Sequence, residues 1–360
     1  MRPTDPDLLP RQPARGDLWK RIGAAIPLRG QQRALVVLII VLAVFFTWRA
    51  PGFLSDQSLG DLLRSASMFG IVGLGMTIVI ISCGSFGGID LSVGSMMAFG
   101  GALGAGLLGT AYDSANPIKL PFLLSIVIAM VVSGLLGALN GGLIARLRLA
   151  PFAVTLGALT LIRGLTYVVV NFFAGNSSGA GITFINPGFD WLGISQVGPL
   201  PSVVFLFVGL AIVVALVLRY TVFGRNLFVL GGGKENARLA GINVTRTIII
   251  VFAVSGLLAG LGGLLLTGRL SSASPLAANG YELDVIMVAV IGGTSLGGGR
   301  GSILGTVLAA IMVSEIDNGL DLMNMQSFQQ YLVKGVILVA AVVLDKIHQR
   351  RTSRTLVGTI

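Results

Sequence analysis

Cysteine, histidine and charge are all scarce in this chain of 360 residues. Cys83 and His348 are each the only residue of their kind, which excludes an intrachain disulfide and effectively excludes a Cys/His metal site. Only 11% of the residues are charged, whereas about a quarter are charged in a soluble domain. Too little polar surface exists to cover a water-soluble protein of this length, so the sequence predicts a protein embedded in lipid.

The chain also lacks a catalytic set and a nucleotide-binding motif. In the stretch GGGKEN, Glu235 follows the lysine where a P-loop needs Ser or Thr, and Phe228 occupies the position of the upstream glycine. The glycine-rich stretch 292–301 follows no predicted strand, which argues against a dinucleotide-binding fingerprint. We therefore expect no cofactor or metal in this chain. If ATP hydrolysis drives the protein, ATP and Mg must be bound by a partner ATPase.

Apolar side chains and glycine are abundant instead. Hydrophobic residues make up 54% of the sequence, the mean hydropathy is +0.89, and glycine occurs 51 times. Small residues suit membrane helices, which associate by close approach because burial against lipid gives no net drive. Ten apolar segments lie at 34–48, 66–83, 91–110, 120–145, 152–174, 201–218, 247–267, 283–296, 302–316 and 328–344. The sequence therefore predicts an all-α polytopic membrane protein with about ten transmembrane helices.

The basic residues, which give a formal net charge of +10, follow the predicted topology. With the N-terminus inside, 19 Lys and Arg residues fall in inner segments, four in outer segments and two within spans. This asymmetry is typical of membrane proteins oriented by positive charge, and it argues against nucleic acid as the partner. It predicts a cytoplasmic N-terminal tail at 1–33, a transmembrane domain at 34–345 and a cytoplasmic C-terminal tail at 346–360.

Two halves of the chain contain similar stretches of sequence. IDLSVGSMMAFGG (89–101) aligns with YELDVIMVAVIGG (281–293), and two shorter matches, 135–139 with 303–307 and 161–164 with 332–335, keep the same order. Aligned stretches lie five predicted spans apart, and an odd number of spans inverts one half relative to the other. The sequence therefore predicts an inverted 5+5 repeat, an arrangement that forms transport pathways between its halves.

Carboxylates lie at the predicted N-terminal ends of two spans. Asp90 and Glu282 can each cap a helix by accepting backbone N–H bonds near the positive end of its dipole. Ser92 offers a further acceptor beside Asp90. The alternative is solute contact, because intramembrane carboxylates are commonly functional, and Asp284 fits either role.

Two cations lie within predicted spans and need partners. An unpaired cation at mid-membrane costs at least about 2.5–3.5 kcal/mol, so Arg163 must face protein or water and find a carboxylate or carbonyl. Lys334 is its equivalent in the repeat, and Glu315 and Asp317 are candidate counter-charges. Both cations are predicted either to hold helices together or to line a polar path for solute hydroxyl groups. The uncharged candidates for that lining are Asn140 and Asn318.

The basic loop 219–246 lies between two long apolar runs and contains the segment ENARLAGI. Good helix formers follow Glu235, and Gly241 stands where such a short helix would stop. Ala237, Ala240 and Gly241 leave a small-residue face suited to a partner's groove, with the leucine and isoleucine supplying apolar contact. A plain surface helix is the alternative. The candidate docking residues are Glu235, Ala237, Arg238, Leu239, Ala240, Gly241 and Ile242.

Several longer motifs occur together in a fixed order. They are GIDLSVGS (88–95), GGGKENARLAGINV (231–244), RLSSASP (269–275), GYELDVI (280–286), GGTSLGGGRGSILGT (292–306), DNGLDL (317–322) and VKGVILVAAVVLD (333–345). Over most of its length, from about residue 54 to residue 345, the chain resembles the ribose/xylose-type sugar permeases of ABC importers.

The resemblance implies a ten-helix permease of the type II, vitamin-B12-importer-like architecture in a bacterial inner membrane. It implies two permease subunits per assembly, in a homodimer or a heterodimer. Residues 235–242 would form the coupling helix that contacts a cytoplasmic ATP-binding subunit, and outer loops, including 175–200, would meet a periplasmic sugar-binding protein. The stretch 82–88 is longer than in the family, and Gly233 and Asn236 replace the family's Asn and Ala.

The sequence thus predicts the permease subunit of an ATP-driven importer for a monosaccharide, a pentose such as xylose or ribose, with no covalent chemistry of its own. The motif DNGLDL favours a xylose-type permease. One alternative is an ion-coupled secondary transporter, in which Asp90, Glu282, Arg163 and Lys334 relay a proton or ion. The other is an importer of the same type for branched-chain amino acids or another small metabolite.

Overall fold

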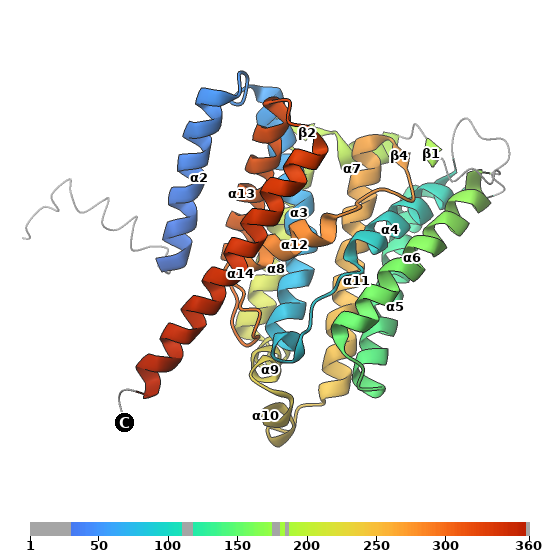
Figure 1. The fold of residues 1–360 in the computed structure, drawn as a ribbon. Helices are drawn as coiled ribbons and strands as arrows, with labels where there is room; N and C mark the ends of the chain where they lie inside the picture. Colours follow the sequence, from blue (N-terminus) through green and yellow to red (C-terminus); the bar gives the residue numbers. More distant parts are fainter. Residues whose placement is uncertain (1–29, 110–117, 175–180, 184–186, 358–360) are drawn as a thin grey trace, which may run out of the picture.

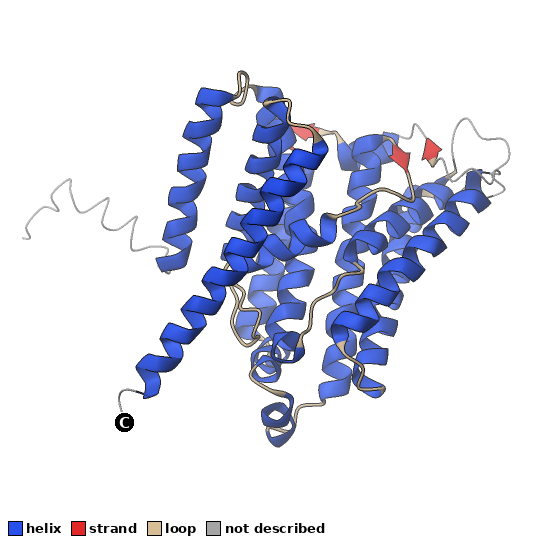
Figure 2. Cartoon of the chain, viewed as in Figure 1, coloured by secondary structure: helices blue, strands red, loops and turns tan. Residues whose placement is uncertain are grey.

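A computed structural model describes residues 30–109, 118–174, 181–183 and 187–357, and the regular structure in it is almost entirely helical (Figure 2). The main helices are α2 (Gly30–Arg49), α3 (Asp56–Cys83), α4 (Val93–Leu108), α5 (Phe122–Arg146), α6 (Pro151–Ala174), α8 (Ser202–Tyr220), α11 (Val244–Leu270), α12 (Tyr281–Ile291), α13 (Ile303–Leu322) and α14 (Ser327–Val357). Most of the predicted N-terminal tail and parts of the outer loop 175–200 lie outside the described residues.

The remaining elements are short. They are the 3-10 turn η2 (Gly84–Phe86), the helices α7 (Pro187–Gly193), α9 (Val222–Gly231) and α10 (Lys234–Leu239), and four two-residue strands. Strand β1 (Ile182–Thr183) pairs antiparallel with β4 (Ser272–Ala273), and β2 (Gln196–Val197) pairs with β3 (Leu200–Pro201). These pairs join loops at one end of the bundle, away from α9 and α10 (Figure 1).

Among the described residues, seven helices are long and apolar enough to cross a membrane, namely α2, α3, α5, α6, α8, α11 and α13. The prediction of a helical polytopic membrane protein is therefore confirmed. Each of the ten predicted apolar segments also overlaps one of these main helices. The full number of spans and the inverted repeat stay predictions, because α4 and α12 are short and α14 has a shorter apolar part.

The first ten residues of α3 were not expected to be helical. The helix begins at Asp56, ten residues before the predicted segment at 66, with the hydroxyl of Ser55 accepting a bond from the amide of Ser58. Asp61 and Arg64 in these first turns make the stretch too polar to stand out as apolar. Helix formation here follows from capping and tertiary packing, which a hydropathy pattern does not register.

Helix α3 forms the centre of the bundle (Figure 1). Its most apolar 18-residue stretch is 100% buried within the chain, against 17–28% for α2, α5, α6 and α8 and 67–72% for α13 and α11. The peripheral helices therefore present their apolar side chains outward, as expected of a protein whose solvent is lipid.

Glycine allows a close helix contact between α5 and α11. A Cβ atom at Gly137 of α5 would lie 2.2 Å from the carbonyl oxygen of Phe252, and one at Gly256 of α11 would lie 2.4 Å from that of Ser133. The two backbones therefore touch without intervening side chains. This contact confirms the interpretation of the glycine-rich composition as helix packing in a membrane.

Helices α4 and α12 begin inside the bundle. With 16 and 11 residues, they are about 24 and 16 Å long, less than the roughly 30 Å hydrocarbon core. The chain reaches α4 through residues 84–92, which rise from the α9 end, and reaches α12 through residues 271–280, which descend from β4 (Figure 1). The first turns of both helices meet, because a Cβ atom at Gly94 would lie 2.3 Å from Glu282 Oε2.

Candidate functional site

The predicted docking segment forms α10, which lies at one end of the bundle (Figure 1). Glu235 and Arg238 point outward and form an exposed ion pair of 3.7 Å. Leu239 is 81% exposed, unusually high for a leucine outside the lipid-facing helices. Ala237 is 0% exposed and packs into the core. The prediction that Ala237 belongs to the exposed face is therefore wrong, because one helical turn cannot present all of its residues on one side.

Helix α10 ends as the sequence predicts, at Gly241. This residue has φ +74°, and its amide donates to the carbonyl of Arg238, while the amide of Ile242 donates to that of Ala237. The two bonds form a Schellman motif, in which glycine supplies the left-handed conformation. Ala240 and Gly241 are exposed, and Ile242 is half-buried.

Lys234, the first residue of α10, contacts the end of α3. Its Nζ atom lies 3.8 Å from the ring centroid of Phe86 in η2, a cation–π contact. Partial burial lowers the pKa of Lys234, Cys83 nearby raises it, and Arg238 adds to the lowering. The sequence offered no signal for this contact, because the two residues lie far apart along the chain.

Lys334 of α14 is paired with two carboxylates. Its Nζ atom lies 3.1 Å from Asp284 Oδ1 in α12 and 3.0 Å from Asp317 Oδ2 in α13. The expectation that Asp317 is a counter-charge is confirmed. Glu315 is not part of this group: it is 2% exposed, and its Oε2 atom has no hydrogen-bond partner. It lies two residues from Asp317, on the other side of α13, since successive helical residues are 100° apart.

Arg163 of α6 satisfies its charge with backbone carbonyls. Its Nη1 atom donates to the carbonyl oxygens of Pro275, at 2.6 Å, and Ala277, at 2.8 Å. Both acceptors lie in the irregular segment that enters α12. Arg163 and Lys334 therefore bind the same region of the fold, one just before the start of α12 and one in its first turn.

Asp90 is completely buried and accepts three hydrogen bonds. Its Oδ1 atom accepts from the backbone amide and the hydroxyl of Ser92, and its Oδ2 atom accepts from Ser255 of α11 at 2.9 Å. Asn140 of α5 donates to the Ser92 hydroxyl at 3.1 Å. Ser92 is the N-cap residue of α4 but makes no side-chain cap bond. Asp90 thus accepts a backbone N–H at the start of α4, as the sequence predicts, whereas Ser92 does not add the cap bond expected of it. With Ser255 and Asn140, these side chains also join three helices.

Ser255 is the member of this group that sequence reasoning missed. It lies in the middle of an apolar helix, where one serine among glycines gives no distinctive signal. Asn140 also lines a groove of about 520 Å³ between α5 and α6. The other described residues that line this groove are apolar.

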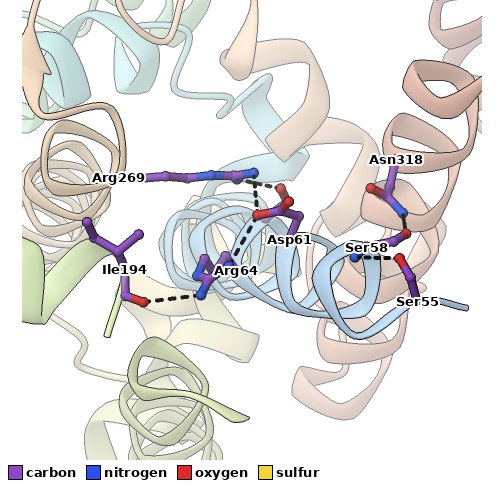
Figure 3. A network of polar contacts seen from close by, with 8 residues as sticks. Ser55, Ser58, Asp61, Arg64, Ile194, Arg269 and Asn318 are labelled. Carbon is purple, nitrogen blue, oxygen red and sulfur yellow. Dashed lines mark hydrogen bonds and ion pairs between the residues drawn. The ribbon is translucent and has the colours of Figure 1, made fainter. Parts of the chain in front are cut away.

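The N-terminal end of α3 contains a further polar network (Figure 3). Asp61 Oδ1 lies 3.2 Å from Arg64 Nη1 and 3.5 Å from Arg269 Nη2, and Arg64 also donates to the carbonyl of Ile194. Asn318 of α13 donates to the Ser58 hydroxyl at 2.7 Å. Asn318 thus joins α13 to α3, and it is not brought together with Asn140, which belongs to the Asp90 group.

Most of the predicted residues therefore belong to three separate arrangements: α10, the Asp90 group, and the residues around the start of α12. Asn318 lies apart from them, bonded to Ser58 of α3. The three arrangements provide an exposed helix face at one end and two buried polar groups within the bundle.

Comparison with known proteins places this architecture in a family. Residues 58–342 match the family described as branched-chain amino acid transport system, permease component. The ribose import permease protein RbsC of Escherichia coli (strain K12) is 36% identical over 319 residues, covering 89% of this chain and 94% of the relative. RbsC of Bacillus subtilis (strain 168) is 38% identical over 315 residues, covering 87% and 90%.

The xylose transport system permease protein XylH of Escherichia coli (strain K12) is 34% identical over 374 aligned positions, covering 88% of this chain and 92% of the relative. No solved structure shows a significant match. The family match spans most of the chain, and the relatives align over nearly their whole length. The chain therefore belongs to the family of branched-chain amino acid transport system permease components, in which its matched relatives include ribose and xylose permeases.

Proposed function

We propose that this chain is the membrane permease subunit of an ATP-driven importer for a monosaccharide, and that a pentose such as ribose or xylose is the substrate. The single observation that supports this most strongly is the similarity, over about nine-tenths of the chain, to permeases named for ribose import and xylose transport. The chain itself performs no covalent chemistry in this proposal. It forms the pathway, and a separate subunit binds ATP and Mg.

The proposed architecture has ten transmembrane helices in two inverted halves of five, of the type II class, with a second permease subunit beside this one. The short helices α4 and α12 fit this arrangement, since both begin inside the bundle at corresponding places in the two halves. Both termini and α10 lie on the cytoplasmic side. This orientation is supported by the basic residues at the α10 end of the helices, such as Arg146 in α5 and Arg219 in α8.

The exposed face of α10 is the proposed contact with the cytoplasmic ATP-binding subunit. Leu239 supplies an apolar contact, and Glu235 and Arg238 supply charges at its edge. Loops at the other end, including the residues around β1 and β4, are the proposed contact with a periplasmic sugar-binding protein. The two partners would then act on opposite ends of the same bundle.

The docking proposal is tested by co-purification with the ATP-binding subunit. Leu239→Asp and Arg238→Glu are expected to abolish association and sugar uptake, because the first places a charge on the apolar contact and the second reverses a charge at its edge. Leu276→Asp, at an exposed leucine in the segment before α12, is the matched control and should leave association intact. Unchanged association in both α10 variants would refute the assignment, as would labelling of residue 234 from the exterior.

Transport in reconstituted vesicles tests the mechanism and the substrate class. The vesicles contain the permease with its ATP-binding subunit on the inner face. Uptake should require ATP inside these vesicles and should persist when an uncoupler removes the proton gradient. Uptake that collapses with the uncoupler at constant ATP would favour an ion-coupled transporter instead. Stimulation of ATP hydrolysis by a binding protein loaded with a pentose, and not with a branched-chain amino acid, is the expected result for substrate class.

A further inference from the structure

The start of α10 and the end of α9 before it are each held against the end of α3 by one contact. The first is the cation–π contact of Lys234, whose Nζ atom lies 3.8 Å from the ring centroid of Phe86. Phe86 is the last residue of η2, directly after α3, and it is half-buried. Unlike Glu235 and Arg238, Lys234 therefore points back toward the bundle and away from the exposed docking face.

The second contact is made by backbone alone. A Cβ atom at Gly231, the last residue of α9, would lie 1.9 Å from the carbonyl oxygen of Ile81 and 2.3 Å from the amide nitrogen of Gly299. The Gly299 amide itself donates to that Ile81 carbonyl at 2.8 Å. Three segments distant in sequence thus meet without side chains between them. A junction packed in this way has no room to take up a displacement by side-chain rearrangement.

The connection from Phe86 to the interior is short. Gly88 turns the chain back on α3, with its amide donating to the carbonyl of Cys83 at 2.9 Å. Two residues later Asp90 is fully buried and bonded to Ser92 and Ser255. Only three residues, 87–89, therefore separate the ring that contacts Lys234 from the carboxylate that joins the start of α4 to α11.

We propose that Lys234 is a positioning residue that transmits displacement of α10 to the connection between α3 and α4, residues 84–92, and through it to the Asp90 group. The inference rests on the proposed function, in which the ATP-binding subunit moves α10. It separates two roles within one short helix. Glu235, Arg238 and Leu239 bind the partner, whereas Lys234 passes the movement inward.

The test measures coupling, which a purely structural role would not alter selectively. The complete transporter, with its ATP-binding and sugar-binding subunits, is reconstituted in vesicles, and sugar molecules moved are counted per ATP hydrolysed. Lys234→Met keeps the aliphatic stem and removes the charge, and Phe86→Leu removes the ring. Each is expected to lower this ratio at least fivefold while association with the ATP-binding subunit stays within twofold of wild type. Lys234→Arg and Phe86→Tyr, which keep the cation and the ring, should stay within twofold of the wild-type ratio.

A double variant identifies the contact itself. If Lys234 acts through Phe86, Lys234→Met/Phe86→Leu should have the ratio of either single variant, and not the product of the two losses. An unchanged ratio in Lys234→Met, or losses that multiply, would overturn the inference. Loss of association in Lys234→Met would also overturn it, by making Lys234 a docking residue. Failure of the wild-type chain to assemble with any ATP-binding subunit would instead remove the proposed function.

Discussion

Lys334 and Asp284 form an ion pair of 3.1 Å that joins α14 to the first turn of α12. Asp317 of α13 completes the group at 3.0 Å, so a single cation connects three helices. The three side chains are between 7% and 17% exposed. Removal of any one of these three charges should therefore destabilise the protein, since a charge left unpaired in such surroundings is costly.

Replacing Lys334 with Met is expected to destabilise the protein by about 3 kcal/mol, because two largely buried carboxylates then lose their counter-charge. The measurement is the free energy of unfolding in detergent. Lys334→Met/Asp284→Asn/Asp317→Asn, in which no charge is left unpaired, should recover most of the loss. A single variant as stable as wild type would contradict the assigned pairing.

Arg163→Met should loosen the segment 271–280 more than any other part of the chain. The substitution removes charge-assisted hydrogen bonds to two carbonyls, each worth about 1.5–3 kcal/mol. Amide hydrogen exchange in 271–280 is expected to rise at least tenfold, and exchange in α2 should be unaffected. Uniformly increased exchange, or none, would show that Arg163 does not hold this segment.

Asp90 should tolerate an amide far better than an apolar side chain. Asp90→Asn keeps an oxygen acceptor for Ser92 and places an NH₂ group beside the Ser255 hydroxyl, which can itself accept. Asp90→Leu leaves the buried hydroxyls without their acceptor, at a cost of about 1–3 kcal/mol for each unsatisfied group. Thermal unfolding should rank wild type and Asn together, well above Leu. An equal loss in both variants would indicate that the negative charge itself is required.

The contact between α5 and α11 predicts opposite outcomes for two glycines in one helix. Gly137→Leu must displace the backbone of α11 and should cost at least about 1–3 kcal/mol. Gly142→Ala, five residues on and with nothing within 4 Å of the added Cβ, should be neutral or stabilise by about 0.5–1 kcal/mol. Unfolding measured on the two variants in parallel provides the comparison. Similar stability of both would contradict close helix approach at Gly137.

The sequence predicted the class of fold because lipid constrains composition directly. Each of the ten apolar segments overlaps one of the main helices, and glycines form the close α5–α11 contact, as the glycine-rich composition predicts. The stop of α10 at Gly241 was also predictable, since a local backbone motif fixes it. The polar start of α3 and the additional helix α9 were not predicted, because capping and packing form these elements rather than an apolar pattern.

The polar groups show where sequence reasoning ends. Arg163 and Lys334 were expected to need partners, and both have them, but the carbonyls of Pro275 and Ala277 have no signature in a sequence. Ser255 is likewise linked to Asp90 only by the fold. A pattern identifies which side chains cannot remain unpaired in a membrane, and tertiary structure alone decides what they pair with.

The apolar residues of α3 have two separate requirements to meet, one during membrane insertion and one in the folded protein. A membrane segment is selected for insertion by its own apolarity, while it is still surrounded by the insertion machinery and lipid. In the finished protein, the most apolar 18 residues of α3 are wholly covered by neighbouring helices. Their hydrophobicity is thus required during biosynthesis, before those neighbours have packed. A polar substitution that the mature bundle would accommodate there can still prevent the chain from entering the bilayer.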